Sequence, residues 1–425
     1  MRAVLGRRGP LDEALAAGPG GARLAPRDRA FARLLVTTVL RRLGQLDALI
    51  DACLERPLKP KLAEARDLMR LGAAQLLFLG TPAHAAVDST VRLARGPRAA
   101  GYRGLVNAVL RRLAREGADL LAGQDPARLN TPDWLWTSWA AAHGEPVARA
   151  IAEAHLREPP LDLFMRDPTA RDEWGTRLDA TVLPTGTLRL APGYGDVARL
   201  SGYGEGAWWV QDVAATLPAR LLGEVSGRRV LDLCAAPGGK TAQLAAAGAR
   251  VTALDISPRR LTRLRENLER LGLAAETVVA DATTWRPPAL SDAVLLDAPC
   301  TATGTIRRHP DIARLKRPAD VTALSAVQDR LLKAALAMVA PGGVLVYAAC
   351  SLQPEEGAAR IEALLGAGAP VDRVPIGAEE IGGSSVCITP AGDLRTLPSH
   401  MAEAGGMDGF YACRLRLRGR EHTVT

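Results

Sequence analysis

From Arg228 onwards the sequence alternates short apolar runs with helix-like segments, and this alternation limits the fold more than any other feature. The successive segments read RRVLDLC, KTAQLAAAG, RVTALD, PRRLTRLRENLERLG, ETVVAD, DAVLLD and VLVYAAC. Repeated strand–helix–strand units form parallel sheets that helices cover on both faces. Ser257 followed by Pro258 favours a helix start at this point. We therefore expect an α/β domain with a mostly parallel sheet over residues 228–425.

Residues 27–117 show a different pattern, in which apolar side chains recur every three or four positions. This spacing, seen in FARLLVTTVLRRL and YRGLVNAVLRRLARE, is typical of amphipathic helices. The chain of 425 residues has room for two or three domains, at roughly 150 residues each. We expect an all-α bundle over residues 1–125, a small mixed α/β region over residues 126–227, and the α/β domain after it.

Positive charge is concentrated in the first of these domains. Residues 1–125 carry 21 Lys and Arg against 12 Asp and Glu, whereas the other residues carry 33 against 34. Such an excess on one module favours a polyanionic partner, most often a nucleic acid. The alternative is an arginine-rich surface that contacts only solvent, and charge alone does not separate the two.

Composition excludes several other classes of protein. The first residues contain no apolar stretch long enough for a secretory signal, and the apolar run 335–350 is interrupted at Pro341. The six cysteines are scattered without a CxxC pair, which argues against disulfides and a zinc site. We expect a cytoplasmic protein with reduced thiols, no metal and no membrane contact, and we take it to be a monomer.

A glycine-containing loop follows the first strand of the α/β domain. It reads CAAPGGKT, from Cys234 to Thr241, and ligands of such folds bind where glycine lets the backbone approach. A phosphate-binding P-loop would need glycine in place of Cys234, and the dinucleotide pattern GxGxxG is absent. These exclusions leave a nucleoside-type cofactor without a phosphate, and S-adenosylmethionine fits that description.

Aspartates follow three successive strands of the predicted sheet: Asp255, Asp281 and Asp297. A single aspartate at a strand end is more often a turn former than a ligand. Three on one edge favour a cofactor site, with Asp255 placed for the ribose hydroxyls. Asp281 is then available to the adenine edge, and Asp297 lies nearest the sulfonium and the substrate.

Two cysteines, Cys300 and Cys350, also stand just after strands of this edge. A lone cysteine there is usually a small buried apolar residue, but two converging on a cofactor pocket suggest a reaction. Carbon 5 of a pyrimidine is a poor nucleophile until a thiolate adds at C6. After methyl transfer the C5 proton must leave and the thiol must be expelled, so two reacting groups make chemical sense.

An ordinary cysteine is only about 3% ionised at pH 7 and needs activation. A helix predicted to start near Pro354 would raise this fraction to roughly 15%. Glu355 and Glu356 are expected to oppose that effect. The remainder must come from the cofactor's positive charge, from Lys240 or from another base.

These motifs, in this order, resemble those of the Sun family of RNA 5-methylcytosine methyltransferases. They are VLDLCAAPGGKT, VTALDIS, VVADAT, LLDAPCTATGTIRRHPD, VYAACSLQPEE and GGMDGFYACRL. The segments DRAFARLLVTTVLRRLGQLD, LMRLGAAQLLFL, PAHAAVDSTVRLAR and GLVNAVLRRLARE resemble the NusB-like RNA-binding helical domain. Together they point to the RsmB type, which implies a Rossmann-like methyltransferase domain and 16S ribosomal RNA as substrate, before full assembly of the subunit.

The resemblance implies that Cys350 is the nucleophile and that Cys300 assists product release. The implied S-adenosylmethionine contacts are Cys234, Ala235, Ala236, Pro237, Gly238, Gly239, Lys240, Asp255, Asp281 and Asp297. The chain departs from the family pattern where Thr301-Ala302-Thr303 replaces Ser-Gly-Thr, and where Ala349 and Gly357 replace threonine and asparagine. These departures affect loop geometry and leave the reacting groups in place.

We further hypothesise that Asp297 accepts a hydrogen bond from the cytosine N4 amino group, which uracil lacks. The target base must be flipped out or already unpaired, because C6 attack needs access to its face. Arg307, Arg308 and His309 are candidates for holding flanking phosphates, although a solvated loop is an equal alternative.

Several alternatives stay open at this point. DNA cytosine-C5 methyltransferases attack from a Pro-Cys pair like Pro299-Cys300, which would exchange the two thiols. The same chemistry on tRNA is a second alternative. A catalytically inactive methyltransferase fold serving as an RNA-binding assembly factor is a third, and a dehydrogenase is the weakest because its nucleotide fingerprint is absent.

Overall fold

The computed structural model describes residues 1–18, 24–94 and 100–419, which divide into two compact units. The helical unit consists of residues 1–157 together with residues 306–317. The α/β unit consists of residues 158–305 and 318–425. Among the described residues, no helix has both the length and the apolar character needed to cross a membrane.

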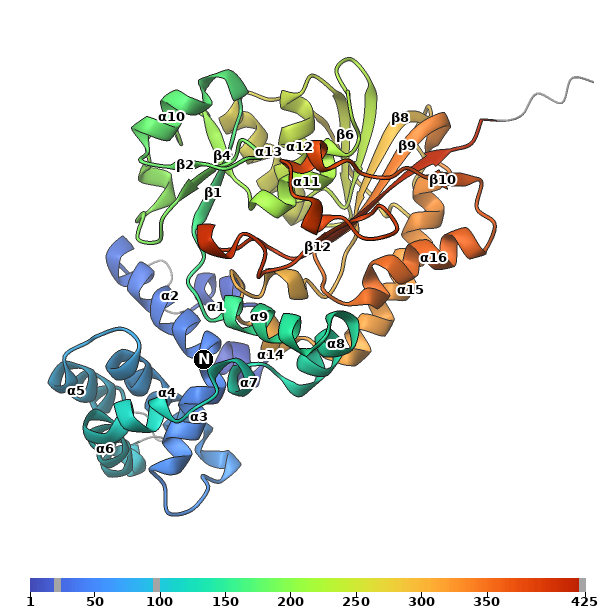
Figure 1. Ribbon diagram of the computed structural model, residues 1–425. Helices are drawn as coiled ribbons and strands as arrows, with labels where there is room; N and C mark the ends of the chain where they lie inside the picture. Colours follow the sequence, from blue (N-terminus) through green and yellow to red (C-terminus); the bar gives the residue numbers. More distant parts are fainter. Residues whose placement is uncertain (19–23, 95–99, 420–425) are drawn as a thin grey trace, which may run out of the picture. The chain divides into compact units, whose positions relative to one another are not determined.

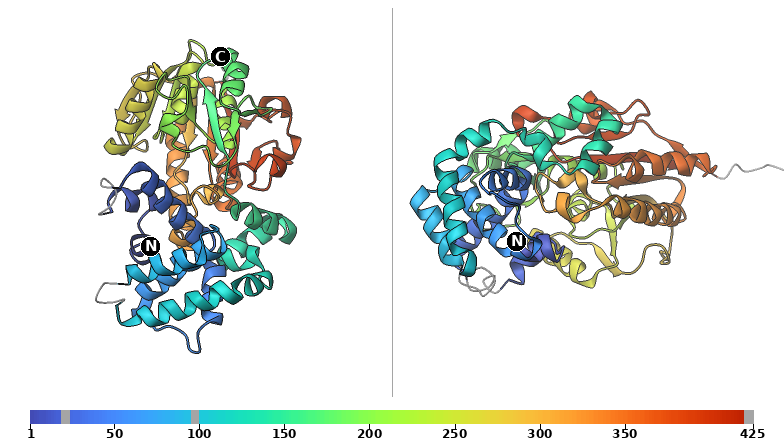
Figure 2. Two further views of the ribbon diagram at one scale, coloured as in Figure 1. Left: turned by 90° about the vertical axis from the view of Figure 1, so that its left-hand side faces the viewer. Right: turned by 90° about the horizontal axis from the view of Figure 1, so that it is seen from below.

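The helical unit confirms the predicted all-α bundle (Figures 1 and 2). Its helices are α1 (Leu11–Ala16), α2 (Pro26–Arg41), α3 (Leu43–Ala52), α4 (Ala63–Leu77), α5 (Ala83–Leu93), α6 (Arg103–Ala122), α7 (Pro126–Asn130), α8 (Asp133–His143), α9 (Glu145–His155) and α14 (Ile312–Leu315). Leucine, valine and alanine side chains of α2, α3, α4 and α6 form its main core. The apolar spacing of three and four therefore marks the buried faces of these helices.

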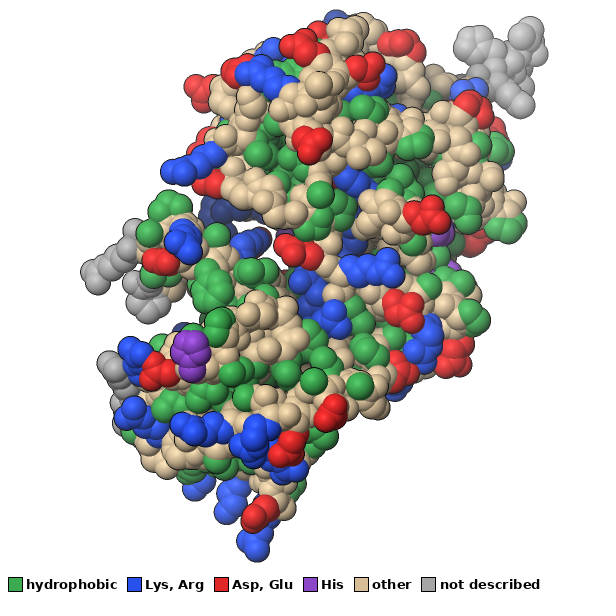
Figure 3. Space-filling view, turned by 60° about the vertical axis from the view of Figure 1, so that its left-hand side comes forward, with side chains coloured by type: hydrophobic (Ala, Val, Ile, Leu, Met, Phe, Trp, Pro, Cys, Tyr) green, Lys and Arg blue, Asp and Glu red, His purple; other side chains and the backbone are tan. Residues whose placement is uncertain are grey.

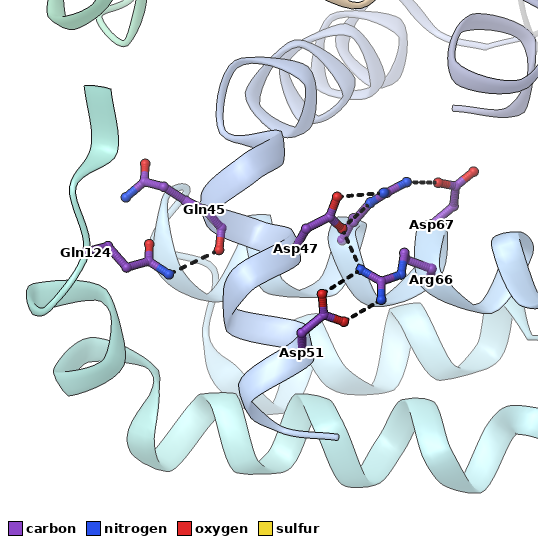
Figure 4. A network of polar contacts seen from close by, with 7 residues as sticks. Gln45, Asp47, Asp51, Arg66, Asp67 and Gln124 are labelled. Atoms are coloured by element: carbon purple, nitrogen blue, oxygen red, sulfur yellow. Dashed lines mark hydrogen bonds and ion pairs between the residues drawn. The ribbon is translucent and has the colours of Figure 1, made fainter. Parts of the chain in front are cut away.

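A network of ion pairs joins α3 to α4 (Figure 4). Arg70 binds Asp47 through two hydrogen bonds of 2.8 Å and donates another of 2.8 Å to Asp67. Arg66 binds Asp47 at 3.0 Å and also pairs with Asp51. Part of the arginine content of the bundle is thus used to hold two helices together rather than to face a partner.

Helices α7 to α9, which follow the predicted boundary at residue 125, belong to the helical unit. The Asp125 side chain caps α7, and Asn130 at its end exchanges hydrogen bonds of 2.9 and 3.1 Å with Gln45 of α3. The segment 306–317 also belongs to this unit. Its Asp311 carboxylate accepts the Leu11 N–H at 2.9 Å, and Arg314 donates to the Asn130 carbonyl at 2.7 Å.

His155 lies buried at the end of α9, with its ring 5.3 Å from that of Trp139. Burial, followed by the charges of Arg307 and Arg41, lowers its pKa from 6.5 to about 3. Between these two values the unfolded chain binds a proton that the folded chain excludes. The stability that the neutral His155 contributes is therefore fully present above pH 6.5. As the pH drops from 6.5 towards 3, the free energy of unfolding falls.

We expect the unfolding free energy to fall by up to ~2 kcal/mol between pH 6.5 and 5 through this group alone. In the His155→Phe variant, which keeps a ring beside Trp139, this part of the pH dependence should be lost. Urea unfolding of both proteins at the two pH values measures the difference. Equal pH dependence in wild type and variant would show that His155 titrates normally.

The α/β unit contains the predicted sheet, and its strand order is β10-β12-β9-β8-β5-β6-β7, with β11 paired to β12. The strands are β5 (Arg229–Leu233), β6 (Arg250–Asp255), β7 (Glu276–Val279), β8 (Ser291–Asp297), β9 (Val339–Ala349), β10 (Val371–Arg373), β11 (Leu394–Thr396) and β12 (Phe410–Leu417). Strands β5 to β9 are parallel, and β10 to β12 run antiparallel at one end. The sheet is therefore mostly parallel, as predicted.

Helices cover both faces of this sheet (Figure 1). They are α11 (Val213–Arg220), α12 (Gly239–Ala246), α13 (Pro258–Leu271), α15 (Pro318–Leu336) and α16 (Ala358–Gly366). Alternate strand residues point to opposite faces, so that Val230 joins the core with α11 and α12 while Leu231 joins the core with α15 and α16. Ser257 caps α13 by accepting the Arg260 N–H, which confirms the predicted helix start.

Residues 158–227, predicted to be part of a separate mixed region, belong to the α/β unit. They form the antiparallel sheet β2-β3-β1-β4 and helices α10 and α11. The bounds are β1 (Leu161–Met165), α10 (Arg171–Arg177), β2 (Thr181–Val182), β3 (Leu188–Leu190) and β4 (Trp208–Val210).

A buried ion pair ties this small sheet to the rest of the unit. The Arg189 guanidinium binds the Asp162 carboxylate twice, at 2.6 and 2.7 Å. Arg189 also donates to the carbonyls of Ala404 and Gly406, each at 2.8 Å, and Asp162 accepts the Val213 N–H at 2.9 Å. One residue pair thus connects the small sheet, the start of α11 and the C-terminal segment.

Candidate active site

The carboxyl ends of β5, β6, β8 and β9 bring the predicted site residues together. Cys234 follows β5, Asp255 and Asp297 end β6 and β8, and Cys350 follows β9. In the register of the sheet, Leu233 pairs with Leu296 and Asp297 pairs with Ala348. Because parallel strands end at one edge, residues far apart in the sequence converge there.

The Sγ atoms of Cys300 and Cys350 lie 3.4 Å apart, within hydrogen-bond distance for sulfur. The hydrogen bond with Cys350, followed by burial and by the charges of Cys350 and Glu356, raises the pKa of Cys300 well above its ordinary value. Cys300 therefore keeps its proton and can donate it in a hydrogen bond to the sulfur of Cys350. This arrangement suits Cys300 as the neutral hydrogen-bond donor of the pair.

The loop that carries Cys300 is held on both sides. The Gly304 N–H donates to the Cys350 carbonyl at 3.0 Å, and the Gly304 carbonyl accepts the Gly409 N–H at 2.8 Å. A Cβ atom at Gly304 would lie 1.9 Å from the Gly409 carbonyl oxygen, so no larger residue fits there. The C-terminal motif GGMDGFYACRL thus supports the cysteine loop, a role that its sequence does not reveal.

Two of the positions that depart from the family pattern, 302 and 357, can be compared with their surroundings in the structure. Ala302 has a φ of 58°, in the left-handed region where the family's glycine would be unstrained. A Cβ atom at Gly357 would lie 2.8 Å from an Arg395 nitrogen and 3.0 Å from the Tyr411 ring. Glycine therefore suits position 357 in this chain, whereas alanine at position 302 is held at a cost in backbone strain.

A lysine–aspartate pair adjoins the cysteines. The Lys240 ammonium lies 2.8 Å from the Asp297 carboxylate and 5.1 Å from the centre of the Phe410 ring. Burial lowers the pKa of Lys240, but the charge and hydrogen bond of Asp297, with a further contribution from Cys350, outweigh burial and raise it. Lys240 therefore stays positively charged beside Asp297.

The two other predicted aspartates make local contacts. The buried Asp255 carboxylate accepts the backbone N–H groups of Ala236 and Ser257 at 3.2 and 2.9 Å, so it shapes the 234–240 loop. Asp281 is exposed and accepts the N–H and hydroxyl of Thr283, which lowers its pKa. These contacts leave the proposed ribose and adenine roles as predictions.

Asp232, inside β5, is a site residue that the sequence reasoning missed. It is fully buried; one oxygen accepts the Thr241 hydroxyl at 2.6 Å and the other has no hydrogen-bond partner. Burial, with the nearby Asp297 and Asp255, raises its pKa to about 7. The signal in the sequence was an acidic residue inside the apolar run VLDLC, where an unsatisfied carboxylate is costly.

This cluster fits S-adenosylmethionine by its charge. The cofactor carries a positive sulfonium and a positive amino group, and the oxygen of Asp232 that has no partner can accept a hydrogen bond from the amino group. Gly238, with a φ of +103°, lets the backbone turn where a Cβ atom would lie 2.7 Å from Leu264. Burial raises the pKa of Cys234 to about 12, so this thiol is unreactive. Among the described residues, no group of three or more His, Cys, Asp or Glu side chains could hold a metal ion.

The three residues predicted to hold RNA phosphates lie in the segment 306–317 of the helical unit. Arg307 is only 2% exposed, whereas Arg308 and His309 are half-buried. Arg307 is thus the least suited of the three to a surface contact with phosphate.

Comparison with known proteins gives matches over both units. The family model described as 16S rRNA methyltransferase RsmB/F matches residues 219–416, and that of the NusB family matches residues 6–115. The ribosomal RNA small subunit methyltransferase B of Pseudomonas putida is 39% identical over 434 residues, covering 98% of this chain and 96% of its own. That of Cronobacter sakazakii is 37% identical over 411 residues, covering 92% and 91%.

Solved structures share the fold at lower identity. The crystal structure of PH0851 has a TM-score of 0.70 at 22% identity and covers 93% of this chain and 91% of its own. NSun6 from Pyrococcus horikoshii, crystallised with SFG, has a TM-score of 0.56 at 20% identity and covers 67% and 98%.

Proposed function

The chain belongs to the RsmB/F family of 16S rRNA methyltransferases, and from this premise we propose that it forms 5-methylcytosine in small-subunit ribosomal RNA. S-adenosylmethionine supplies the methyl group, with Cys350 as the nucleophile and Cys300 as its partner. The observation that supports these roles is the sulfur–sulfur contact of 3.4 Å, in which the raised pKa of Cys300 makes this thiol the donor.

The chemistry follows from this contact. The Cys350 thiolate adds to C6 of the cytosine, and the electrons of the C5–C6 double bond make C5 the nucleophile that takes the methyl group. A solvent water then takes the C5 proton, the electrons of the C5–H bond re-form the C5–C6 double bond, and the Cys350 sulfur departs as a thiolate. The S–H of Cys300 hydrogen-bonds to this departing sulfur and so assists release.

Asp297 is proposed to read the cytosine N4 amino group as well as to hold Lys240. Its side chain is 30% exposed, so a substrate can reach it while one oxygen stays bound to Lys240. We expect Asp297→Asn to reduce kcat/KM on the cytosine substrate by roughly 10- to 100-fold and to weaken the preference over uracil. Methyl transfer to matched oligonucleotides with cytosine or uracil at the target measures this, with Asp179→Asn, at an exposed position outside the site, as the comparison. Full rate and full preference in Asp297→Asn would refute the proposed role.

The helical unit is proposed to bind the RNA. Its 1–125 segment carries the positive excess of the chain, and Figure 3 shows many Lys and Arg side chains on the helical unit. Arg308 and His309 of the 306–317 segment are the proposed phosphate contacts. We expect the protein to act in the cytoplasm, as a monomer and without a metal, before the small subunit is fully assembled.

Methyl transfer from labelled S-adenosylmethionine tests the proposal. Purified 16S ribosomal RNA and tRNA are compared as substrates, and the modified nucleoside is identified by mass spectrometry after digestion. 5-Methylcytosine in 16S RNA alone supports the proposal. Label in tRNA alone would show that tRNA is the substrate and would contradict it. Cofactor binding without transfer to either RNA would support the inactive assembly factor instead.

A further inference from the structure

Glu356 lies fully buried beside the two cysteines, in the short turn Pro354–Glu356. One of its oxygens accepts the backbone N–H of Thr301 at 2.8 Å and lies 3.3 Å from the side-chain nitrogen of Gln328. The other accepts the hydroxyl of Ser351 at 2.6 Å and also the hydroxyl of Thr301. A single carboxylate therefore binds the neighbour of Cys300 and the neighbour of Cys350.

The surroundings reinforce this bridge. The Thr303 hydroxyl lies 3.2 Å from that of Ser351 and accepts the Leu352 N–H at 2.9 Å. The Tyr347 hydroxyl donates to the Glu356 carbonyl at 2.7 Å. A buried carboxylate costs several kcal/mol unless hydrogen bonds satisfy it, and here neutral donors from several segments do so. The segment Thr301-Ala302-Thr303 differs from the Ser-Gly-Thr of the family pattern, but it keeps the two hydroxyl groups that take part in this network.

The sequence reasoning expected Glu356 to oppose ionisation of Cys350 from the start of a helix. The structure instead has a turn of three residues at Pro354, and α16 begins only at Ala358. Glu356 binds both loops rather than lying beside the nucleophile alone, and its charge is among the causes that keep the proton on Cys300. Glu355 is exposed and lacks this position.

We propose that Glu356 is a positioning residue for methyl transfer, whose carboxylate fixes the Cys300 and Cys350 loops so that their sulfur atoms stay in contact. The inference rests on the proposed cytosine-C5 reaction for its effect on turnover. Its effect on the thiols themselves does not depend on RNA, and so the two can be tested separately.

The test compares Glu356→Ala, Glu356→Gln and the exposed neighbour Glu355→Gln in the full-length protein. The first measurement is the rate of Cys350 alkylation by iodoacetamide across pH, followed by mass spectrometry of its peptide. The second is kcat and KM for methyl transfer to 16S RNA. Glutamine keeps the shape of the carboxylate and can accept the Thr301 N–H, but its amide nitrogen cannot accept from the Thr301 and Ser351 hydroxyls, so it should recover only part of the loss.

We expect Glu356→Ala to lower kcat roughly 10- to 100-fold, with KM for S-adenosylmethionine within about twofold of wild type. Its Cys350 alkylation profile should shift along the pH axis, Glu356→Gln should fall between, and Glu355→Gln should match wild type. A wild-type alkylation profile and wild-type turnover in Glu356→Ala would overturn the inference. If Glu356→Ala does not fold, the same result in Glu356→Gln would overturn it. If wild type methylates no RNA yet the alkylation profile still shifts, the proposed function fails while the positioning role stands.

Discussion

The Cys300→Ala protein is expected to accumulate a covalent protein–RNA adduct that survives denaturing gels, whereas Cys350→Ala forms neither adduct nor product. Without the Cys350 thiolate no bond to C6 forms, so methyl transfer should fall by at least ~10⁴-fold. Without Cys300 the first bond still forms, but the Cys350 sulfur lacks its hydrogen-bond partner, 3.4 Å away, when it must leave. Incubation with S-adenosylmethionine and 16S RNA, followed by gel analysis and methyl counting, measures both effects.

Cys53→Ala is the control, because Cys53 is a free cysteine that belongs to the helical unit, whereas Cys300 and Cys350 belong to the α/β unit. It should methylate as wild type does. If Cys350→Ala instead accumulates the covalent RNA adduct and Cys300→Ala forms neither adduct nor product, the roles of the two thiols are reversed. The arrangement of the DNA cytosine-C5 methyltransferases then applies. Absence of both adduct and transfer in all forms, wild type included, would favour the inactive assembly factor.

Replacing Arg189 with methionine should destabilise the α/β unit by about 3–5 kcal/mol, because it leaves the Asp162 carboxylate buried without its partner. The two carbonyls of the C-terminal segment that Arg189 binds also lose their donor. Urea unfolding measures the loss. The matched control is Arg171→Met, since Arg171 pairs with Asp172 on the surface and should change stability by less than about 1 kcal/mol.

A double variant sharpens this test. Asp162→Leu together with Arg189→Met removes both charges, and it should be more stable than Arg189→Met alone. Additive losses, with the double variant the least stable, would contradict the view that an unpaired buried charge causes the effect.

The sequence predicted the parts of the fold that depend on periodic patterns. Alternating apolar runs identified β5 to β9, and the residues at their carboxyl ends were predicted to meet because parallel strands share an edge. The helical bundle followed from its spacing of apolar side chains. Cys300 and Cys350 could therefore be expected to lie close together. The sequence could not predict the distance between their sulfur atoms or which of the two thiols keeps its proton.

What the sequence did not predict depends on contacts between distant positions. Nothing near Asp311 indicates that its carboxylate accepts the N–H of Leu11, so the return of residues 306–317 to the helical unit was missed. Asp232 was passed over because a strand pattern hides one acid among apolar residues. The hydrogen bonds of Glu356 to Thr301 and Ser351 were not predicted, because they depend on how the two cysteine loops meet in the fold.

The passage of the chain through residues 306–317 has a consequence for dissecting this protein. The chain leaves the α/β unit after Thr305, contributes α14 to the helical unit, and returns at Pro318. A fragment starting at residue 158 would therefore carry a stretch whose hydrogen-bond partners Leu11 and Asn130 had been deleted. The N-terminal domain therefore cannot be removed simply by truncating the chain. A methyltransferase fragment that folds alone would need a redesigned segment between residues 305 and 318.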